Sequence, residues 1–404
     1  MSPLLVFLRR VLHLQALVLC KATFDADGAA VLQVRRRTHA KARCAQHRCV
    51  LQGQLVARKK RWRHLNLAQT PLYLEAEVRE GRCPQCDGRR VEDVPWAAHR
   101  AEHTWAFDRY VARLVQITDQ TAVSELAKIA WRTVGAIVQR VVAALGPKHL
   151  LDDLVGISVD ETAYKRGHRY LTIVVNLETG DAVWAAEGKS AATLGQFFDA
   201  LGPERCAKLE VVAMDMHGGY AKAVQERCPN ADVVYDRFHI VQLLLDAVDE
   251  VRRAECVQLT AVDRRMLKGT RFALLRNPKH LQPKHHAAIA RVHATNRRLM
   301  RAYELRVDFE EFWTLTHPDD GRRFLMNWTR AALRSRLAPL RRFAKTIRAR
   351  IDGVLGFIRW YGVTSARSEG RNNKIKMLIH RAYGFHSAEA VLAMITLCCS
   401  GIAL

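Results

Sequence analysis

The sequence lacks an uncharged apolar run long enough to cross a membrane. The most apolar stretch near its start, from Leu4 to Cys20, is interrupted by Arg9, Arg10 and His13, whereas a membrane-spanning helix needs about 18 or more apolar residues. No small-residue cleavage site follows this stretch, so we do not expect a secretory signal peptide. The sequence therefore predicts a cytoplasmic protein that acts without a membrane.

The sequence also has too few cysteines for a disulfide-stabilised scaffold. Ten cysteines among 404 residues are typical of a reducing compartment, where clustered cysteines are candidates for metal ligands. The chain is long enough for two or three domains with substantial cores. We find no internal repeat and no low-complexity tract, and 49% hydrophobic residues exclude a disordered or collagen-like chain.

Acidic residues are the scarcer charge, since 40 Asp and Glu stand against 64 Lys and Arg, a net charge of +24. Such an excess favours a polyanionic partner, above all nucleic acid. The charge is uneven, because residues 1–100 carry +11, residues 101–250 carry −6 and residues 251–350 carry +16. This pattern is expected where carboxylates of the middle segment hold cations and the flanks hold phosphates. Ordinary scatter of solvated surface charge is the alternative.

Residues 104–148 have the pattern of three short helices. Apolar positions recur at helical spacing until Gly146-Pro147 ends the third helix. The tight connection between the second and third helices favours a helix-turn-helix whose third helix enters the major groove, although any three-helix bundle has the same pattern. Arg132, Thr133 and Gln139 are then the candidates for contacts with base edges.

From residue 150 on, the periodicity changes to that of strands. We expect strands at 154–164, 170–177, 182–186, 209–214 and 232–235, and helices at 191–201 and 220–228. This order predicts a mixed sheet flanked by helices, an α/β architecture. Residues 236–350 are expected to be almost wholly helical, and residues 364–382 to form one more helix.

Two carboxylates fall on expected buried strands. Asp160 lies within the first strand, and Asp215 directly follows the run 211–214. A desolvated carboxylate is costly without a partner, and Mg²⁺ is a suitable one because it binds carboxylate oxygens. Neighbouring strands of one sheet would bring Asp160 and Asp215 together.

The helix expected at 364–382 offers a third carboxylate. At about 100° per residue, one face carries Glu369, Asn373, Lys376 and His380, while Ile375, Leu378, Ile379 and Ala382 cover the other. Two metal ions held by three carboxylates can activate a water or a 3′-hydroxyl and stabilise the leaving oxygen of phosphoryl transfer. In that scheme Asp160 bridges both ions, Asp215 and Glu369 hold one each, and Lys374 and Lys376 contact phosphates. The alternative is that these carboxylates are only structural.

Four cysteines gather between residues 44 and 95. Cys83 and Cys86 have the spacing of half a zinc site, whereas Cys44 and Cys49 are separated by four residues that include His47. A tetrahedral zinc site could use the four cysteines, or His47 in place of one of them. Four buried, unligated thiols are the alternative.

Several segments of the chain together resemble a DDE transposase of the ISL3 insertion-sequence family. They are 158–161 (SVDE), 213–216 (AMDM), 235–239 (YDRFH) and 369–376 (EGRNNKIK), the last followed by 381–385 (RAYGF). Residues 61–65 and the Cys83-x-x-Cys86 pair look like the zinc-binding head of this family, so the resemblance spans nearly the whole chain. The spacing of Cys44 and Cys49 departs from the Cys-x-x-Cys that usually opens this head.

The resemblance implies an RNase H-like catalytic core that is interrupted by a helical insertion at about 240–345. Asp160, Asp215 and Glu369 fall on the catalytic positions of the family, and Asp236 and His239 match a further feature whose role is less defined. The implied activity is cleavage and strand transfer of double-stranded DNA at terminal inverted repeats, into a target DNA. The implied ions are catalytic Mg²⁺, which Mn²⁺ can replace, and structural zinc.

The predicted organisation has three parts. A zinc-binding head (1–103) and a helix-turn-helix (104–148) would recognise the element ends, and an RNase H-like core (150–404) would cut and join DNA. Since two ends must be held together, the family implies at least a homodimer on DNA, associated with the bacterial nucleoid.

Two other functions fit the same residues. A metal-dependent nuclease or RNase H-like resolvase would use the same carboxylates without joining DNA. A non-catalytic DNA-binding regulator would use the head and the helix-turn-helix beside a decayed core, although all three carboxylates and the neighbouring lysines are present.

Overall fold

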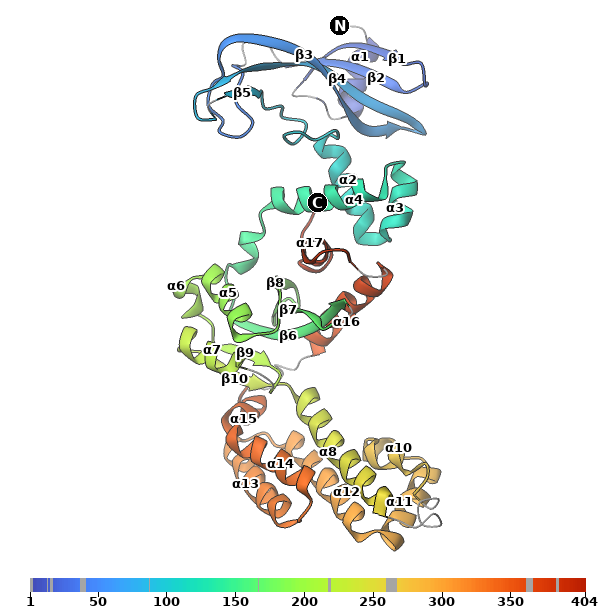
Figure 1. Cartoon of the computed structure of the whole chain (residues 1–404), viewed down its shortest axis with the longest axis vertical. Coiled ribbons are helices and arrows are strands. Elements are labelled where there is room, and N and C mark those ends of the chain that lie inside the picture. The colour runs from blue at the N-terminus through green and yellow to red at the C-terminus, as the bar shows by residue number, and fades with distance from the viewer. Residues whose placement is uncertain are drawn as a thin grey trace. The chain divides into compact units, whose positions relative to one another are not determined.

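The computed structural model describes residues 3–404 apart from 13, 15–16, 37–40, 87, 166, 217–218, 259–266, 361–365 and 383–384, and apart from the side chains of 147–148, 366–369 and 371–372. The chain divides into two compact units, residues 1–145 with 402–404 and residues 146–401; Figure 1 shows their elements. No helix in the described ranges combines the length and apolar character of a membrane span.

The first unit contains a five-stranded sheet. Helix α1 (Pro3–Val11) precedes β1 (Val18–Phe24), β2 (Ala30–Arg35), β3 (Gln52–Leu67), β4 (Thr70–Cys83) and β5 (Gly88–Val91). The strand order is β1-β2-β4-β3, with β5 paired to β4. Trp62, Leu72 and Leu74 form the centre of its core. A turn at 25–28 joins β1 to β2, where Gly28 has a φ of 77° and the Asp25 carboxylate accepts a hydrogen bond from the Ala29 amide.

Three helices complete the first unit and confirm the predicted helical segment. They are α2 (Trp105–Ile117), α3 (Gln120–Ala127) and α4 (Trp131–Leu145). The side chains of Thr104 and Asp119 accept hydrogen bonds from the first turns of α2 and α3, as N-cap residues do. Arg140 of α4 donates two hydrogen bonds, of 2.7 and 2.8 Å, to the fully buried Asp108 of α2. This bidentate pair fixes the third helix against the first.

The second unit contains a mixed sheet, as the sequence predicts. After the 3-10 turn η1 (Pro147–Leu151), its strands are β6 (Gly156–Lys165), β7 (Arg169–Asn176), β8 (Ala182–Glu187), β9 (Val211–Met214) and β10 (Asp232–Tyr235). The order is β10-β9-β6-β7-β8. Strands β6, β7 and β8 are antiparallel, and β9 and β10 run parallel to β6. Helices α5 (Ala191–Leu201), α6 (Pro203–Cys206) and α7 (Tyr220–Arg227) connect the later strands.

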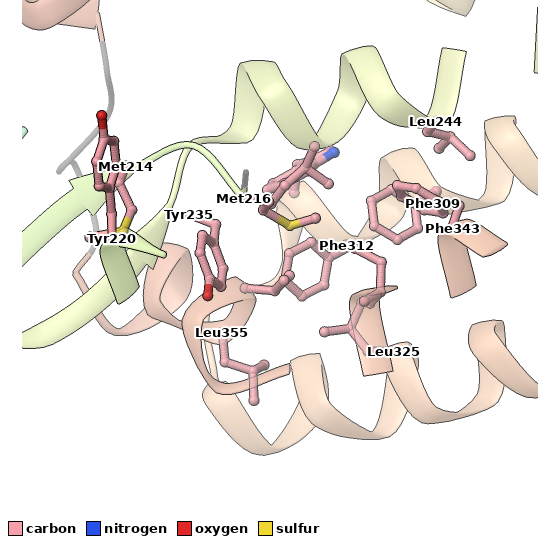
Figure 2. Close-up of a cluster of buried hydrophobic side chains, with 14 of the residues drawn as sticks. Met214, Met216, Tyr220, Tyr235, Leu244, Phe309, Phe312, Leu325, Phe343 and Leu355 are labelled. Atoms are coloured by element: carbon pink, nitrogen blue, oxygen red, sulfur yellow. The ribbon is translucent and has the colours of Figure 1, made fainter. Parts of the chain in front are cut away.

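A helical segment leaves the sheet after β10. It comprises α8 (Arg237–Gln258), α10 (Thr270–Leu275), α11 (Pro283–Thr295), α12 (Arg297–Phe309), α13 (Pro318–Arg334), α14 (Ala338–Ala349) and α15 (Ile351–Arg359), with the 3-10 turns η2 (Pro278–His280) and η3 (Glu310–Thr314). Figure 2 shows side chains from the sheet and from this segment in one apolar cluster, among them Met214, Tyr235 and Phe312. The helical segment is therefore packed as one body with the sheet.

The segment also returns to the strand from which it leaves. Helix α15 packs on β10, so closely that a Cβ atom at Gly356 would lie 2.8 Å from Val234 Cγ2. Trp360, the residue after α15, donates a hydrogen bond of 2.9 Å to Asp232 of β10. Entry and exit of the helical segment thus lie at one edge of the sheet.

The last two helices cover the sheet. Helix α16 (Ala366–Arg381) packs against β6, and α17 (Ala388–Cys399) packs against β8. The predicted faces of α16 are confirmed, because Ile375, Leu378 and Ile379 are buried while Asn373 and Lys376 are exposed. Sequence periodicity does not predict α17, since its residues are apolar on nearly every side.

Candidate active site and metal centre

The two predicted strand carboxylates lie at equal height on neighbouring strands. Strands β6 and β9 are parallel, and Val159 is the partner of Met214. Asp160 and Asp215 are therefore the next residues along the two strands, and both are half-buried. The pairing predicted from sequence, across 54 intervening residues, is realised by a shared register.

Asp215 has a carboxylate oxygen that the described residues leave unsatisfied. Its Oδ1 atom is buried and has no hydrogen-bond partner among them, while Oδ2 lies 3.7 Å from Nδ1 of His239. Burying such an oxygen without a partner is costly. Together with the neighbouring Asp160, this orphaned oxygen fits a divalent cation, which binds carboxylate oxygens.

Asp160 stands in an environment of mixed charge. Burial raises its pKa, and the negative charge of Asp236 acts in the same direction. The amide of Glu161, which donates to Asp160 Oδ1 at 2.7 Å, and the positive charges of His239 and Lys376 oppose this effect. Four predicted site residues from β6, the start of α8 and α16 are therefore electrostatic neighbours.

Asp236 and His239 occupy the junction between β10 and α8. The Asp236 amide donates to the carbonyl of Met214 at 2.9 Å, and its carboxylate accepts a hydrogen bond of 2.8 Å from the Phe238 amide. Asp236 thus caps α8 and holds the end of β9. His239 follows on the first turn of α8 and contacts Asp215.

Helix α16 brings a cation to the same strand. It packs against β6, and the charge of Lys376 reaches Asp160. Glu369 lies about two helical turns before Lys376 on the same face, but its side chain lies outside the described residues, so its convergence with the other carboxylates stays a prediction. Lys374 is placed differently, because its ammonium donates to the carbonyl of Cys398 on α17 at 2.6 Å.

Glu161 is a further acidic residue that the sequence reasoning does not single out. Burial raises its pKa, a hydrogen bond from Tyr220 lowers it, and the negative charges of Asp160 and Asp215 raise it further. The Tyr220 hydroxyl also lies 3.0 Å from Thr172 Oγ1. The only sequence signal for Glu161 is its position directly after Asp160.

A candidate metal centre lies in the first unit. The ligand atoms of Cys44, His47, Cys83 and Cys86 all lie within 4.8 Å of one another. The Cys44 and Cys86 sulfurs are 3.9 Å apart, and His47 Nδ1 lies 3.0 Å from Cys86 Sγ and 3.8 Å from Cys83 Sγ. A tetrahedral zinc ion with bonds of about 2.3 Å separates its sulfur ligands by roughly 3.8 Å. The four residues therefore fit a zinc ion.

Cys49 belongs to the predicted ligand set but lies outside this group, although its sulfur is 3.3 Å from Cys83 Sγ. Cys44-x-x-His47 has the same spacing as Cys83-x-x-Cys86, and this repeated spacing is the signal that identifies His47.

Hydrogen bonds favour the thiolate form of Cys83. Burial raises the pKa of Cys83, but hydrogen bonds from His47, Cys49 and two backbone amides outweigh that effect and lower this pKa to about 5. The backbone amide of Cys86 is one of these donors, at 3.3 Å from the sulfur. Since the thiolate is the form that binds metal, the local structure prepares this residue as a ligand.

Helix α4 presents the residues predicted to contact bases. Arg132 and Gln139 are exposed and Thr133 is partly exposed. Ala136, between Arg132 and Gln139 on the same face, is exposed as well, so only a small side chain separates the two polar ones. Val134, Ile137, Val138 and Val141 face the interior.

Comparison with known proteins gives two family matches. A family model described as a transposase matches residues 157–395, a range that includes both strand carboxylates and α16. A second model, described as the helix-turn-helix domain of transposase family ISL3, matches residues 92–142, which include α2, α3 and most of α4.

Two curated relatives are named as insertion-sequence transposases, and this chain aligns with most of the length of each. The transposase for insertion sequence element IS1557 of Mycobacterium tuberculosis is 37% identical over 406 residues, covering 93% of this chain and 90% of the relative. The transposase for insertion sequence element IS1001 of Bordetella parapertussis is 29% identical over 333 residues, covering 82% of each chain.

Proposed function

Because this chain belongs to the ISL3 family of insertion-sequence transposases, we propose that it binds the terminal inverted repeats of its element, cuts the DNA there and joins the ends to target DNA. The observation that carries the catalytic part is the placement of Asp160 and Asp215 side by side, with the buried Asp215 Oδ1 lacking a partner among the described residues.

The sheet supports an RNase H-like core within residues 150–404. Its first three strands form an antiparallel meander, and two further strands extend the sheet in parallel beyond the first strand. The helical segment that follows β10 corresponds to the insertion expected at about 240–345, and α16, the helix to which Glu369 belongs, packs against β6.

The proposed catalytic residues are Asp160, Asp215 and Glu369, which would hold two Mg²⁺ ions, or Mn²⁺ in their place. When bound, such ions polarise the scissile phosphate and lower the pKa of the attacking water or 3′-hydroxyl. His239 orients the Asp215 carboxylate through the contact of 3.7 Å. Lys376 supplies positive charge beside Asp160, where a substrate phosphate would bind, and Asn373 is exposed one turn before it on the same helix.

The first unit supports recognition of double-stranded DNA. We propose that Arg132, Thr133 and Gln139 of α4 contact base edges in the major groove and that zinc stabilises the head at 1–103. The boundary between head and helix-turn-helix at 103–104 remains a prediction. Since two element ends must be brought together, at least a homodimer is expected on DNA, within the bacterial cytoplasm where that DNA lies.

The helical insertion supports a further interaction with phosphates. Arg341, Lys345 and Arg348 lie on one face of α14, all are exposed, and none of them has a carboxylate within 4.0 Å among the described residues. Exposed cations at this spacing suit the DNA backbone.

The decisive experiment for catalysis is Asp215→Asn. We expect it to lower cleavage of an element end by roughly a factor of 10³ or more, because it removes a metal ligand worth several kcal/mol in the transition state, while DNA affinity stays the same. Asp246→Asn, an exposed carboxylate on α8, is the matched control. Cleavage retained in the Asp215→Asn variant would reject the assignment.

A strand-transfer assay separates the alternatives. Integration of a pre-cut end into a target plasmid is expected of the proposed function. Hydrolysis without integration would indicate a nuclease or resolvase, and end binding without either reaction would indicate a regulator.

A further inference from the structure

We propose that a basic pocket in the first unit binds one phosphate of the DNA backbone beside the metal centre, an inference that rests on the DNA-binding function proposed above. The pocket has a volume of about 320 Å³ and lies over β3, β4 and β5, with residues 97–100 along its rim. Ala45, which follows the metal ligand Cys44, forms part of its wall. The pocket therefore lies directly beside the metal centre.

Each acidic residue that lines the pocket forms an ion pair with at least one arginine. Glu80 forms ion pairs with Arg58 at 3.1 Å and Arg89 at 3.4 Å. These two arginines also line the pocket, so their charge is already balanced in part.

The other two acidic lining residues pair with arginines that do not line the pocket. Glu92 is bound by Arg79 at 2.7 Å, and Asp93 forms an ion pair with Arg48. Neither carboxylate is left to neutralise the remaining cations of the wall.

Lys59, Lys60, Arg90 and Arg100 are the lysines and arginines of the pocket that remain. In the described part of the chain none of them has a carboxylate within 4.0 Å. Three of them converge, because the positive charges of Arg100, Lys60 and Arg90 add to the effect of burial in lowering the pKa of His99, which lines the same pocket, while the negative charge of Asp93 opposes them. Cations without a carboxylate partner around one cavity are the arrangement that an anion stabilises, although the Arg90 side chain also interacts with the thiol of the metal ligand Cys86.

Lys60 is the clearest example of a cation in the pocket that lacks a bound anion. Burial lowers its pKa, although the negative charge of Glu102 acts against that effect, and its ammonium lies 5.3 Å from the centre of the Trp62 ring. A partly desolvated cation without a directly bound anion is unfavourable, and a phosphate in the pocket would provide one.

One residue of the pocket wall has a buried hydrogen-bond donor without a described partner. Trp62 lines it and is only 1% exposed, and its Nε1 has no partner among the described residues. A phosphodiester offers several acceptor oxygens and one negative charge, which suits a wall of guanidinium and ammonium groups. Each nucleotide of DNA carries such a group, so a single pocket can bind any sequence.

The first test compares the salt dependence of DNA binding in the full-length, zinc-loaded protein. The variant combines Lys60→Gln and Arg100→Gln, and the control combines Lys21→Gln and Lys41→Gln, two exposed lysines outside the pocket with the same total charge change. A variant that no longer binds this phosphate should have a slope of log K against log salt reduced by about 0.9 and an affinity about eightfold lower at 0.1 M salt. The decrease should be equal for an element-end duplex and an unrelated duplex. A variant with the slope and affinity of the control would overturn the proposal.

The second test locates the phosphate at the pocket. Acylation of lysines, read by mass spectrometry, should show Lys60 protected by duplex DNA, with the exposed Lys21 of β1 as an internal reference in the same unit. Equal labelling of Lys60 with and without bound DNA would overturn the proposal that DNA binds at this pocket. Protection by inorganic phosphate at the same phosphate concentration would overturn the assignment to DNA in favour of a free-phosphate site. Failure of the proposed transposition chemistry would be seen separately, as cleavage by the Asp215→Asn variant.

Discussion

At the scale of single residues, the metal centre depends on which residue joins Cys44, Cys83 and Cys86. The structure groups His47 with them and leaves Cys49 outside. We therefore expect His47→Ala to reduce the zinc content per chain well below that of the wild type, whereas Cys49→Ala retains its zinc, as measured by elemental analysis of the purified protein. Loss of zinc in the Cys49→Ala variant but not in His47→Ala would reverse the assignment.

His64 gives the first unit a dependence on pH. It is 3% exposed, and burial lowers its pKa to about 4 from an ordinary value of 6.5. The unfolded chain therefore binds a proton near pH 6.5 that the folded chain binds only near pH 4, so stability present above pH 6.5 is lost as the pH falls. Between pH 7 and pH 5 this loss is about 2 kcal/mol.

The measurement is urea unfolding at both pH values. His64→Gln should show about 2 kcal/mol less destabilisation between pH 7 and pH 5 than the wild type, because Gln does not titrate. His280→Gln, an exposed histidine of η2, should behave like the wild type. The interpretation fails where the His64→Gln variant keeps the full pH dependence.

Single residues differ in how far the sequence reveals them. Asp160 and Asp215 can be predicted because apolar strand residues surround or precede them. The sequence cannot reveal the isolation of Asp215 Oδ1, since that depends on the packing of α8 against the strand end. His47 can be predicted only as an alternative ligand, because the sequence does not show whether His47 or Cys49 lies with the other three residues.

At the scale of elements, the arrangement of α2 against α4 depends on one buried ion pair. Asp108 is fully buried and accepts both hydrogen bonds from Arg140. Asp108→Ala should destabilise the unit by about 3–5 kcal/mol, because it leaves a guanidinium without its partner, and it should weaken DNA binding through misplacement of α4. Denaturant unfolding measures the first effect. Glu125→Ala, on the exposed side of α3, is the control, and equal stability of the two variants would contradict the argument.

The contact between α15 and β10 is equally specific. A Cβ at Gly356 would lie 2.8 Å from Val234 Cγ2 and 3.2 Å from the Val233 carbonyl. Gly356→Ala should therefore destabilise the second unit by about 1–3 kcal/mol through overpacking. Gly195→Ala in α5, where a Cβ meets nothing within 4 Å, should be neutral or stabilise by up to about 1 kcal/mol. Thermal unfolding of both variants tests this, and a neutral Gly356→Ala variant would show that the contact has room to relax.

Elements with a clear period are the ones that the sequence predicts. Helix α16, for example, has an apolar and a polar face. Most of β3 is exposed on both sides around its run of basic residues, so it has no alternation to detect. Helix α17 is too apolar to show a face.

At the scale of the whole molecule, the charge pattern of the sequence agrees with the division of labour that we propose. The carboxylates Asp160 and Asp215 belong to the acidic segment 101–250, while the basic segment 251–350 forms helices of the insertion. The net charge of each segment follows from the sequence. The sequence does not show which cations are free to bind a phosphate. That depends on which arginines form ion pairs in the folded protein, as Arg342 does with Glu250.

This distinction gives a test of placed charge against total charge. Replacing Arg341, Lys345 and Arg348 of α14 by Gln removes three cations that have no ion pair among the described residues, whereas replacing Arg253, Arg271 and Arg298 by Gln removes three that are bound to Asp249 or Glu255. Both sets lower the net charge of +24 equally. If the α14 face tracks phosphates, only the first set should reduce the salt slope of DNA binding, by about 0.9 for each phosphate that the variant no longer neutralises. Equal slopes in the two variants would mean that total charge, and not the α14 face, determines affinity.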